Sequence, residues 1–148
     1  MLQIRKMTGA DAKTVLPMVY GFYRSDAVDH AVPEETLNRT FQAAVTDGSL
    51  LEGFVLEDET GAVGFAYLSP YYACEVGGVN MVLEEIFIIP EAQGKGYGTE
   101  FFRWMEETYP EVRRFRLEVT ESNQAAVRLY KKLGYDFIRY EQMAKDRK

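Results

Sequence analysis

The sequence is poor in the residues that build metal sites and disulfides. Its 148 residues include one cysteine, one histidine and one tryptophan. A single cysteine cannot form an internal disulfide, and one cysteine with one histidine cannot supply the Cys/His ligand set of a zinc site. We therefore expect neither a disulfide framework nor a metal cofactor.

Long apolar runs are also missing. No stretch approaches the roughly 18 apolar residues that a membrane span needs, and Met1 is not followed by the basic and apolar segments of a secretory signal. The composition is 47% apolar and 14% aromatic, which is enough for a core. We expect residues 1–148 to form a single domain, located in the cytoplasm and without a membrane partner.

The charge is negative and unevenly distributed. A formal net charge of -6 makes the chain a poor general binder of nucleic acid. Residues 1–89 carry 13 acidic and 5 basic side chains, whereas residues 90–148 carry 10 acidic and 12 basic ones. This division suits a protein that holds a cationic molecule on one side and a phosphorylated one on the other, but solvated helix faces produce it equally well.

The hydrophobic pattern predicts one mixed set of helices and strands. Short apolar and aromatic runs, several of them alternating, predict strands at residues 2–7, 51–57, 62–71, 79–89, 115–120 and 135–143. Apolar residues at helical spacing predict helices that begin near residues 10, 33, 98 and 122, the last of them ended by Gly134. The resulting order, βααβββαβαβ, is typical of an α+β or mixed α/β domain.

The densest motif is a glycine loop over residues 93–99. Gly94, Gly96 and Gly98 stand at alternate positions between a strand stopped by Pro90 and an amphipathic helix. Glycines allow the backbone amides to approach a ligand closely, and the helix adds its positive end, so the loop suits an anion. The spacing differs from that of ATP-binding and dinucleotide-binding loops. A mobile turn before a helix remains the alternative.

Three blocks together carry a family resemblance. Residues 93–98 fit the signature Gln/Arg-x-x-Gly-x-Gly/Ala at every fixed position, and residues 83–90 and 123–135 agree in order and spacing. The chain therefore resembles the GCN5-related N-acetyltransferases (GNAT family), and residues 64–100 look most like diamine and polyamine acetyltransferases. The resemblance implies the GNAT fold, a mostly antiparallel twisted sheet flanked by about four helices, and acetyl-CoA as cosubstrate.

The resemblance also implies a set of cofactor-binding residues. They are Ile86, Phe87, Ile88, Gln93, Gly94, Lys95, Gly96, Tyr97, Gly98, Thr99, Asn123, Ala126, Tyr130 and Lys132. Backbone amides of the glycine loop would hold the pyrophosphate, and those near residues 86–88 would meet the oxyanion if that strand splays from its neighbour. Asn123 would help to hold the pantetheine arm, cap its helix, or do both. For the 3′-phosphate the candidates are Lys95, Arg128, Lys131 and Lys132, each otherwise a solvated side chain.

The implied reaction is attack of a primary amine on the acetyl thioester. An alkylammonium with a pKa of about 10.4 must first lose a proton to a base. Glu84 and Glu85 are the candidates, and neighbouring strand residues face opposite ways unless a bulge intervenes. The resemblance favours Glu84 as the base and Glu85 as a substrate-side or structural residue, although both could be ordinary solvated or ion-paired residues. Tyr130 matches the tyrosine that protonates the leaving thiolate, and is otherwise a core residue.

Taken together, these features predict direct transfer of an acetyl group to a small cationic amine in a ternary complex. The acidic residues that favour a basic acceptor are Asp26, Asp29, Glu34, Glu35 and Glu75. The alternatives are a peptide or protein amine as acceptor, and a regulatory module that binds acyl-CoA without turnover. Only 13 residues follow Tyr135, short for the family's usual two final strands, so a second subunit could complete the sheet in a homodimer.

Overall fold

A five-stranded sheet forms the centre of the computed structural model, which describes residues 1–25, 27–28 and 30–147. The strands, in spatial order, are β1 (Gln3–Lys6), β2 (Glu52–Asp58), β3 (Gly61–Ala73), β4 (Gly78–Ile88) and β5 (Arg114–Leu117). Strands β1 to β4 pair antiparallel, and β5 pairs parallel to β4. The predicted, mostly antiparallel sheet is confirmed.

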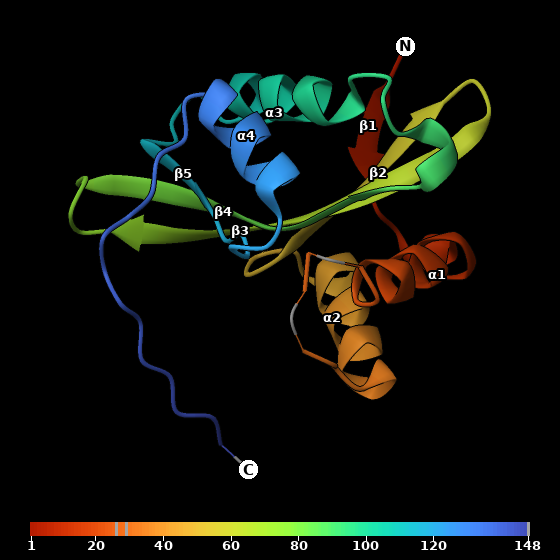
Figure 1. Ribbon diagram of the computed structural model, residues 1–148. Coiled ribbons are helices and arrows are strands. Elements are labelled where there is room, and N and C mark those ends of the chain that lie inside the picture. Colours follow the sequence, from red (N-terminus) through yellow and green to blue (C-terminus); the bar gives the residue numbers. More distant parts are fainter. Residues whose placement is uncertain (26, 29, 148) are drawn as a thin grey trace.

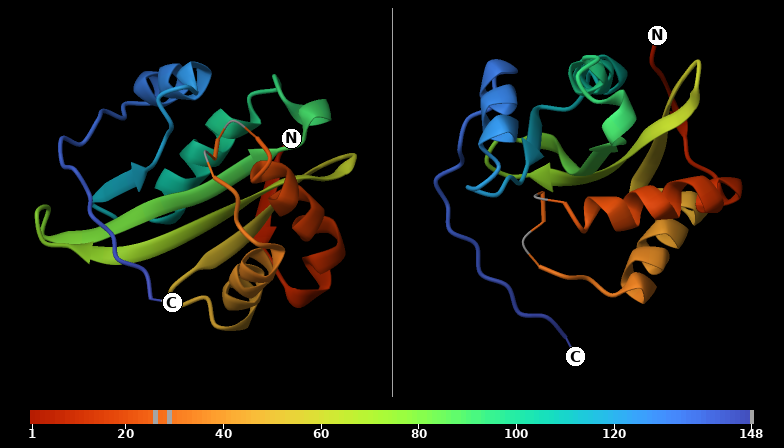
Figure 2. Two further views of the ribbon diagram at one scale, coloured as in Figure 1. Left: turned by 60° about the horizontal axis from the view of Figure 1, so that its bottom comes forward. Right: turned by 45° about the vertical axis from the view of Figure 1, so that its right-hand side comes forward.

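Two layers of helix cover the sheet. The helices are α1 (Ala12–Phe22), α2 (Glu34–Thr46), α3 (Tyr97–Thr108) and α4 (Gln124–Lys132), with short 3-10 turns η1 (Gly9–Asp11) and η2 (Pro90–Ala92). Helices α1 and α2 lie on one face, and α3 and α4 lie on the other (Figures 1 and 2). The predicted α+β class and the four helices are therefore confirmed.

The core is divided by the sheet. On β3, Phe65 and Tyr67 belong to the apolar cluster under α1 and α2, whereas Ala66 and Leu68 belong to the cluster under α3 and α4. Side chains alternate between the faces of a strand, so a strand buried on both faces has a continuous apolar sequence. This explains why β3 shows an apolar run rather than polar alternation.

Two irregularities in β4 shape the middle of the sheet. Tyr67 pairs with Glu85 and Leu68 pairs with Leu83, which leaves Glu84 as the extra residue of a β-bulge. The pairing of β4 with β5 ends at Leu83, although β4 continues to Ile88. The expected splay between these strands is therefore present, and it opens the sheet beside the glycine loop.

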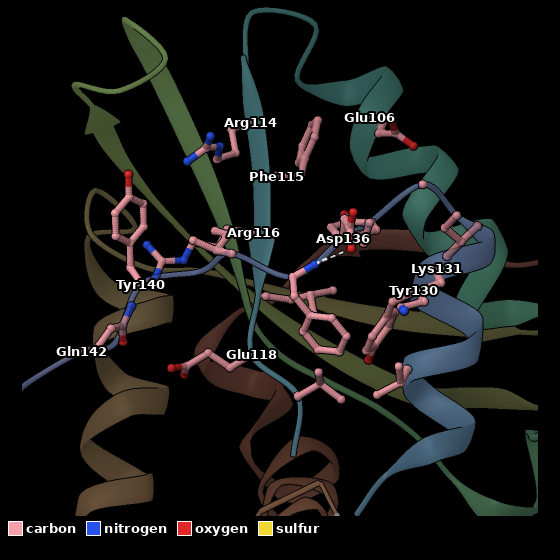
Figure 3. Close-up of a pocket in the computed structure, with 18 residues that line it drawn as sticks. Glu106, Arg114, Phe115, Arg116, Glu118, Tyr130, Lys131, Asp136, Tyr140 and Gln142 are labelled. Carbon is pink, nitrogen blue, oxygen red and sulfur yellow. Dashed lines mark hydrogen bonds between the residues drawn. The ribbon is translucent and has the colours of Figure 1, made fainter. Parts of the chain in front are cut away.

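The strand predicted at residues 135–143 is wrong. After Gly134 the chain forms neither helix nor strand through residue 147. A strand needs an edge beside it to satisfy its backbone groups, and this segment crosses β5 rather than running along it (Figure 3). The other predicted elements exist with shifted ends; β5, for example, ends at Leu117 instead of residue 120.

Candidate active site

The glycine loop forms an open turn before α3. Gly94 and Gly96 both have φ of +81°, in the left-handed region that glycine adopts without strain. A Cβ atom added at either position would meet nothing within 4 Å, so the backbone faces open space. Gly96 directly precedes the first turn of α3, whose free amides attract negative charge. The loop therefore fits a pyrophosphate.

A cleft of about 410 Å³ lies beside this loop, where β4 and β5 separate. Its lining consists of Phe22, Ser25, Ala27, Ile86, Phe87, Ile88, Gln93, Gly98, Phe102, Asn123, Leu129 and Tyr130. Seven of these residues are predicted cofactor residues, and they come from β4, from the loop before α3 and its first turn, and from α4 with its N-cap. The cleft also reaches Phe22 at the end of α1. It therefore extends from the α3 and α4 face of the sheet to the α1 face.

The other predicted cofactor residues lie outside this lining. Gly94, Lys95, Gly96 and Thr99 belong to the glycine loop and the start of α3, while Ala126 and Lys132 lie on α4, the latter exposed. Tyr97 turns away from the loop and donates its hydroxyl to Asp58 Oδ2 at 2.7 Å. Its side chain therefore braces the end of β2, and only its backbone is available to a phosphate.

Asn123 has the capping role that the sequence predicts. Its Oδ1 accepts a hydrogen bond from the Ala126 amide at 3.3 Å, so α4 begins after Asn123 instead of opening at Ser122. Because Asn123 also lines the cleft, both of its expected roles remain open to it.

Backbone amides of β4 point into the splay. The Ile89 amide donates to the Val63 carbonyl on β3 at 2.9 Å, and amide direction alternates along a strand. The Ile86 and Ile88 amides therefore point away from β3, toward the cleft. In agreement, the Ile88 carbonyl accepts a hydrogen bond from Gln93 Nε2 at 3.0 Å on that side. Such amides can meet a developing negative charge.

Tyr130 is held firmly on α4. Its ring packs against Phe102 and Tyr135, with centroids 5.6 and 6.2 Å away. The Tyr135 amide donates to the Tyr130 carbonyl at 3.0 Å and the Gly134 amide to the Lys131 carbonyl at 3.1 Å, the pair of bonds that ends a helix at a left-handed glycine. Burial raises the pKa of the Tyr130 hydroxyl, so it is protonated and able to donate at neutral pH.

The bulge places Glu84 and Glu85 on the same face of the sheet. Ser69 donates to Glu84 Oε2 at 3.1 Å, and Tyr23 donates to Glu85 Oε2 at 2.8 Å. Ser69 and Tyr67 lie two residues apart on β3 and so share the face that packs under α1. Neighbouring strand residues normally face opposite ways, but the bulge turns Glu84 and Glu85 the same way. Both carboxylates therefore face the α1 side.

The two carboxylates differ in environment. Glu84 is exposed, whereas Glu85 is partly buried. Burial, together with the charge of Glu84, raises the pKa of Glu85 to about 7, against the lowering effect of the Tyr23 hydrogen bond. Glu85 Oε1 and the Tyr67 hydroxyl are both buried without a hydrogen-bond partner in the part of the chain that the structure describes. Glu85 thus has one oxygen anchored and one free.

Sequence reasoning missed Tyr23 and Tyr67. Tyr23 directly follows the last turn of α1, and Tyr67 is the β3 residue that pairs with Glu85. In the sequence both stand among apolar residues at core spacing, which is the ordinary pattern of packed aromatic residues. Only the pairing of β3 with β4 and the packing of α1 bring their hydroxyls to a carboxylate.

The acidic residues of the predicted acceptor loops that the structure describes lie at separate places. Asp26 and Asp29 lie outside the described residues. Glu34 and Glu35 stand in the first turn of α2, where Glu35 pairs with Arg39 at 3.7 Å, and Glu75 pairs with Arg114 at 3.7 Å. Among the described residues, no group of three or more His, Cys, Asp and Glu side chains could hold a metal.

Within the described ranges, no helix has both the length and the apolar character needed to cross a membrane.

The family model for "Acetyltransferase (GNAT) family" matches residues 16–135. Thialysine N-epsilon-acetyltransferase of Mus musculus is 39% identical over 59 residues, which cover 38% of this chain and 35% of that protein. The match thus spans about a third of the length of this curated relative.

Solved structures share the fold at low sequence identity. A possible acetyltransferase from Clostridium difficile 630 has a TM-score of 0.84 and 15% identity, covering 99% of this chain and 97% of that one. The aminoglycoside N-acetyltransferase AAC(6')-Iy in complex with CoA has a TM-score of 0.78 and 16% identity over 99% and 95%. Since residues 16–135 include the glycine loop, both glutamates and Tyr130, the chain belongs to the GNAT acetyltransferase family, whose enzymes use acetyl-CoA.

Proposed function

We propose that the chain is an acetyl-CoA-dependent N-acetyltransferase that acts on the primary amine of a small cationic molecule by direct transfer in a ternary complex. The observation that carries the proposal is the cleft itself. It connects the glycine loop and Tyr130 on one side with the end of α1 on the other, next to the strand that bears Glu85. Cofactor and acceptor can therefore meet at the splay of β4 and β5.

Acetyl-CoA supplies the activated acetyl group as a thioester. The glycine loop would hold its pyrophosphate through backbone amides, and Asn123 would contact the pantetheine arm. The amides of Ile86 and Ile88 would stabilise the charge that develops on the acetyl oxygen. Among the four candidate cations for the 3′-phosphate, Lys95 belongs to the loop itself.

We assign the base to Glu85, in place of Glu84, which the resemblance favours. A base acts best when its pKa lies near the working pH, and the pKa of Glu85 is about 7. Because its unpaired Oε1 is buried, Glu85 would take the proton from the acceptor ammonium through water, while Tyr23 keeps Oε2 in place. The exposed Glu84 would attract the cation to the same face.

Tyr130 would act at the other end of the reaction. A thiolate leaves more easily when a hydroxyl protonates it, since the parent thiol has a pKa of about 8.5 if it resembles cysteine. Tyr130 lines the cleft, and its hydroxyl is protonated at neutral pH because burial raises its pKa. As the nitrogen bonds to the acetyl carbon and the C–S bond breaks, the Tyr130 proton would pass to sulfur. Of the two protons that the nitrogen loses, one would pass through Glu85 to solvent, and the other would return through solvent to Tyr130.

The acceptor class follows from charge and from the relatives. Glu84 and Glu85 lie on one face beside the aromatic residues Tyr23 and Phe87, an arrangement that favours a cation over an anion. The relatives named above act, by their names, on thialysine and on aminoglycosides. Both acceptor classes carry primary amines on a cationic body, as the proposal requires.

The experiment is release of CoA thiol from acetyl-CoA with diamines, polyamines, basic amino acids, aminoglycosides and basic peptides. The signal of the exposed Cys74 must be subtracted. We expect amine-dependent turnover that falls in Tyr130→Phe and in Glu85→Gln. Binding of acetyl-CoA without turnover of any amine would favour a regulatory module, and failure to bind acetyl-CoA would refute the role of the glycine loop.

We also propose that the chain forms a homodimer, as the sequence predicts, because its sheet ends on β5 in the described residues. The cytoplasmic location expected from the sequence stays a prediction, and cell fractionation tests it.

A further inference from the structure

The face of the sheet that carries Glu84 and Glu85, which we call the acceptor face, continues toward β5. Ser69 and Tyr71 stand two residues apart on β3, so their side chains lie on the same face. Ser69 donates to Glu84 Oε2 at 3.1 Å, and the Tyr71 hydroxyl accepts a hydrogen bond from Arg116 Nη1 at 2.9 Å. The carboxylate of Glu84 and the guanidinium of Arg116 are therefore both fixed on the acceptor face.

The register of the sheet sets the separation between Arg116 and the glutamates. Arg116 pairs with Val82 on β4, three residues before Glu85. A strand rises about 3.3 Å per residue and the bulge takes up one residue, so the step from Val82 to Glu85 spans about 7–10 Å. Figure 3 shows Arg116 and Phe115 on opposite sides of β5, in agreement with this register.

Arg116 carries a positive charge that no carboxylate neutralises in the part of the chain that the structure describes. Its bond to Tyr71 uses one of the five N–H donors of the guanidinium. By contrast, Arg114 on the same strand pairs with Glu75 at 3.7 Å. Glu84 and Arg116 share the acceptor face without forming an ion pair with each other, so the face presents a separate anion and cation to a ligand.

A buried amide lies next to the pair of Tyr71 and Arg116. Asn80 pairs with Tyr71 on β3 and with Arg114 on β5, and its side chain is wholly buried. Neither Oδ1 nor Nδ2 of Asn80 has a hydrogen-bond partner among the described residues. Because buried polar groups are nearly always paired, this amide has hydrogen-bonding capacity that a polar ligand group beside Arg116 would use.

These placements narrow the class of acceptor. We propose that the acceptor carries a carboxylate about six bonds from its reactive amine, as a basic amino acid does, and that Arg116 holds this carboxylate while the amine lies at Glu84 and Glu85. The inference rests on the proposed acetyl transfer and adds to it a residue that determines specificity.

Distance and charge support this assignment. Six bonds of about 1.5 Å in an extended zigzag chain span roughly 7–8 Å, which matches the step along β4 from the level of Arg116 to Glu85. A guanidinium binds a carboxylate through charged, directional hydrogen bonds. A diamine of the same length would place its second ammonium near the same guanidinium, where like charges repel. Arg116 therefore favours an amino acid over a diamine.

The test compares kcat/KM for lysine, 6-aminohexanoate and 1,5-diaminopentane in the assay of CoA thiol release. The second compound is lysine without its α-amine, and the third is lysine without its carboxylate. We expect the natural chain to prefer each compound that carries a carboxylate over the diamine by at least tenfold, which corresponds to about 1.4 kcal/mol. Arg116→Gln should remove this preference, mainly through KM. Arg116→Glu should reverse it in favour of the diamine, and turnover of the diamine shows that both variants are folded.

Arg114→Gln is the matched control, because Arg114 lies on the same strand two residues away and its charge is already paired with Glu75. Its preference should equal that of the natural chain. Turnover of the diamine with no preference for a carboxylate, or a preference that Arg116→Gln leaves intact, would overturn the role of Arg116 and leave acetyl transfer standing. No turnover with any amine would overturn the proposed function and, with it, this inference.

Discussion

The hydrogen bond from Tyr23 to Glu85 predicts a specific change in pH dependence. Tyr23 donates to Glu85 Oε2 at 2.8 Å, and this bond favours the charged carboxylate. If Glu85 is the base, kcat/KM rises with pH through its pKa of about 7. Tyr23→Phe removes the bond, so the pKa of Glu85 should rise and the acid limb should move to higher pH. A hydrogen bond to a charged group contributes about 1.5–3 kcal/mol, and one pKa unit corresponds to about 1.4 kcal/mol. Water that replaces the Tyr23 hydroxyl restores part of this hydrogen-bond free energy, so we expect the pKa of Glu85 to rise by about one unit.

The assay is kcat/KM for one amine between about pH 5.5 and 9, a range below the titration of an alkylammonium near 10.4. Tyr20→Phe is the matched control, because Tyr20 lies on α1, which Tyr23 directly follows, and donates to Asn38 Oδ1 at 2.7 Å instead of to Glu85. Its profile should equal that of the natural chain. An unshifted profile in Tyr23→Phe, with Glu85→Gln inactive, would refute the tuning by Tyr23. Full activity in Glu85→Gln would refute the base itself.

Four further predictions concern the same region. Glu84→Gln removes a charge that raises the pKa of Glu85, so the acid limb of kcat/KM should move to lower pH, opposite to Tyr23→Phe. Folding raises the pKa of Glu85 from 4.5 to about 7. The stability that the protonated Glu85 provides is therefore present below about pH 4.5 and is lost as the pH rises through 7. Glu85→Gln should accordingly stabilise the fold at pH 8, by at most about 3 kcal/mol in urea titrations. Tyr67→Phe removes a buried hydroxyl without a partner, which costs about 1–3 kcal/mol, so at about 2–4 °C per kcal/mol the melting temperature should rise by about 2–12 °C; a lower melting temperature would show that the hydroxyl is paired. Gly96→Ala and its control Gly61→Ala, both at positive φ with open space around the Cβ, should each cost about 1–2 kcal/mol of stability, but only Gly96→Ala should weaken acetyl-CoA binding in calorimetry, by at least severalfold.

Features that depend on local sequence could be predicted. Gly134 ends α4 with φ of +98°, and Gly96 precedes α3 with φ of +81°, because few other residues adopt that backbone without strain. The helical spacing that places Tyr130 on the inner side of α4 is equally local. These positions also carry the family motifs, so the glycine loop and the helix that bears Tyr130 could be placed from sequence, while their cofactor roles stay a prediction.

Features that depend on pairing between distant segments could not be predicted from the sequence. The alternation in residues 135–143 describes a segment able to form a strand, but whether an edge lies beside it depends on the path that the chain takes out of α4. Tyr23 and Tyr67 look like core residues for the same reason, since their hydroxyls acquire a partner or a role only through packing.

The bulge at Glu84 shows how two adjacent glutamates acquire different chemistry. In a regular strand one of them would face the α3 side, and a single carboxylate would stand on the acceptor face. The extra residue turns both toward α1, one exposed and one partly buried against Tyr23 and Tyr67. The charge of the exposed carboxylate then helps to raise the pKa of its neighbour toward neutral pH. In the proposed mechanism, one irregularity in register would thus separate attraction of the cation, at Glu84, from removal of its proton, at Glu85, as two carboxylates in unlike environments do elsewhere.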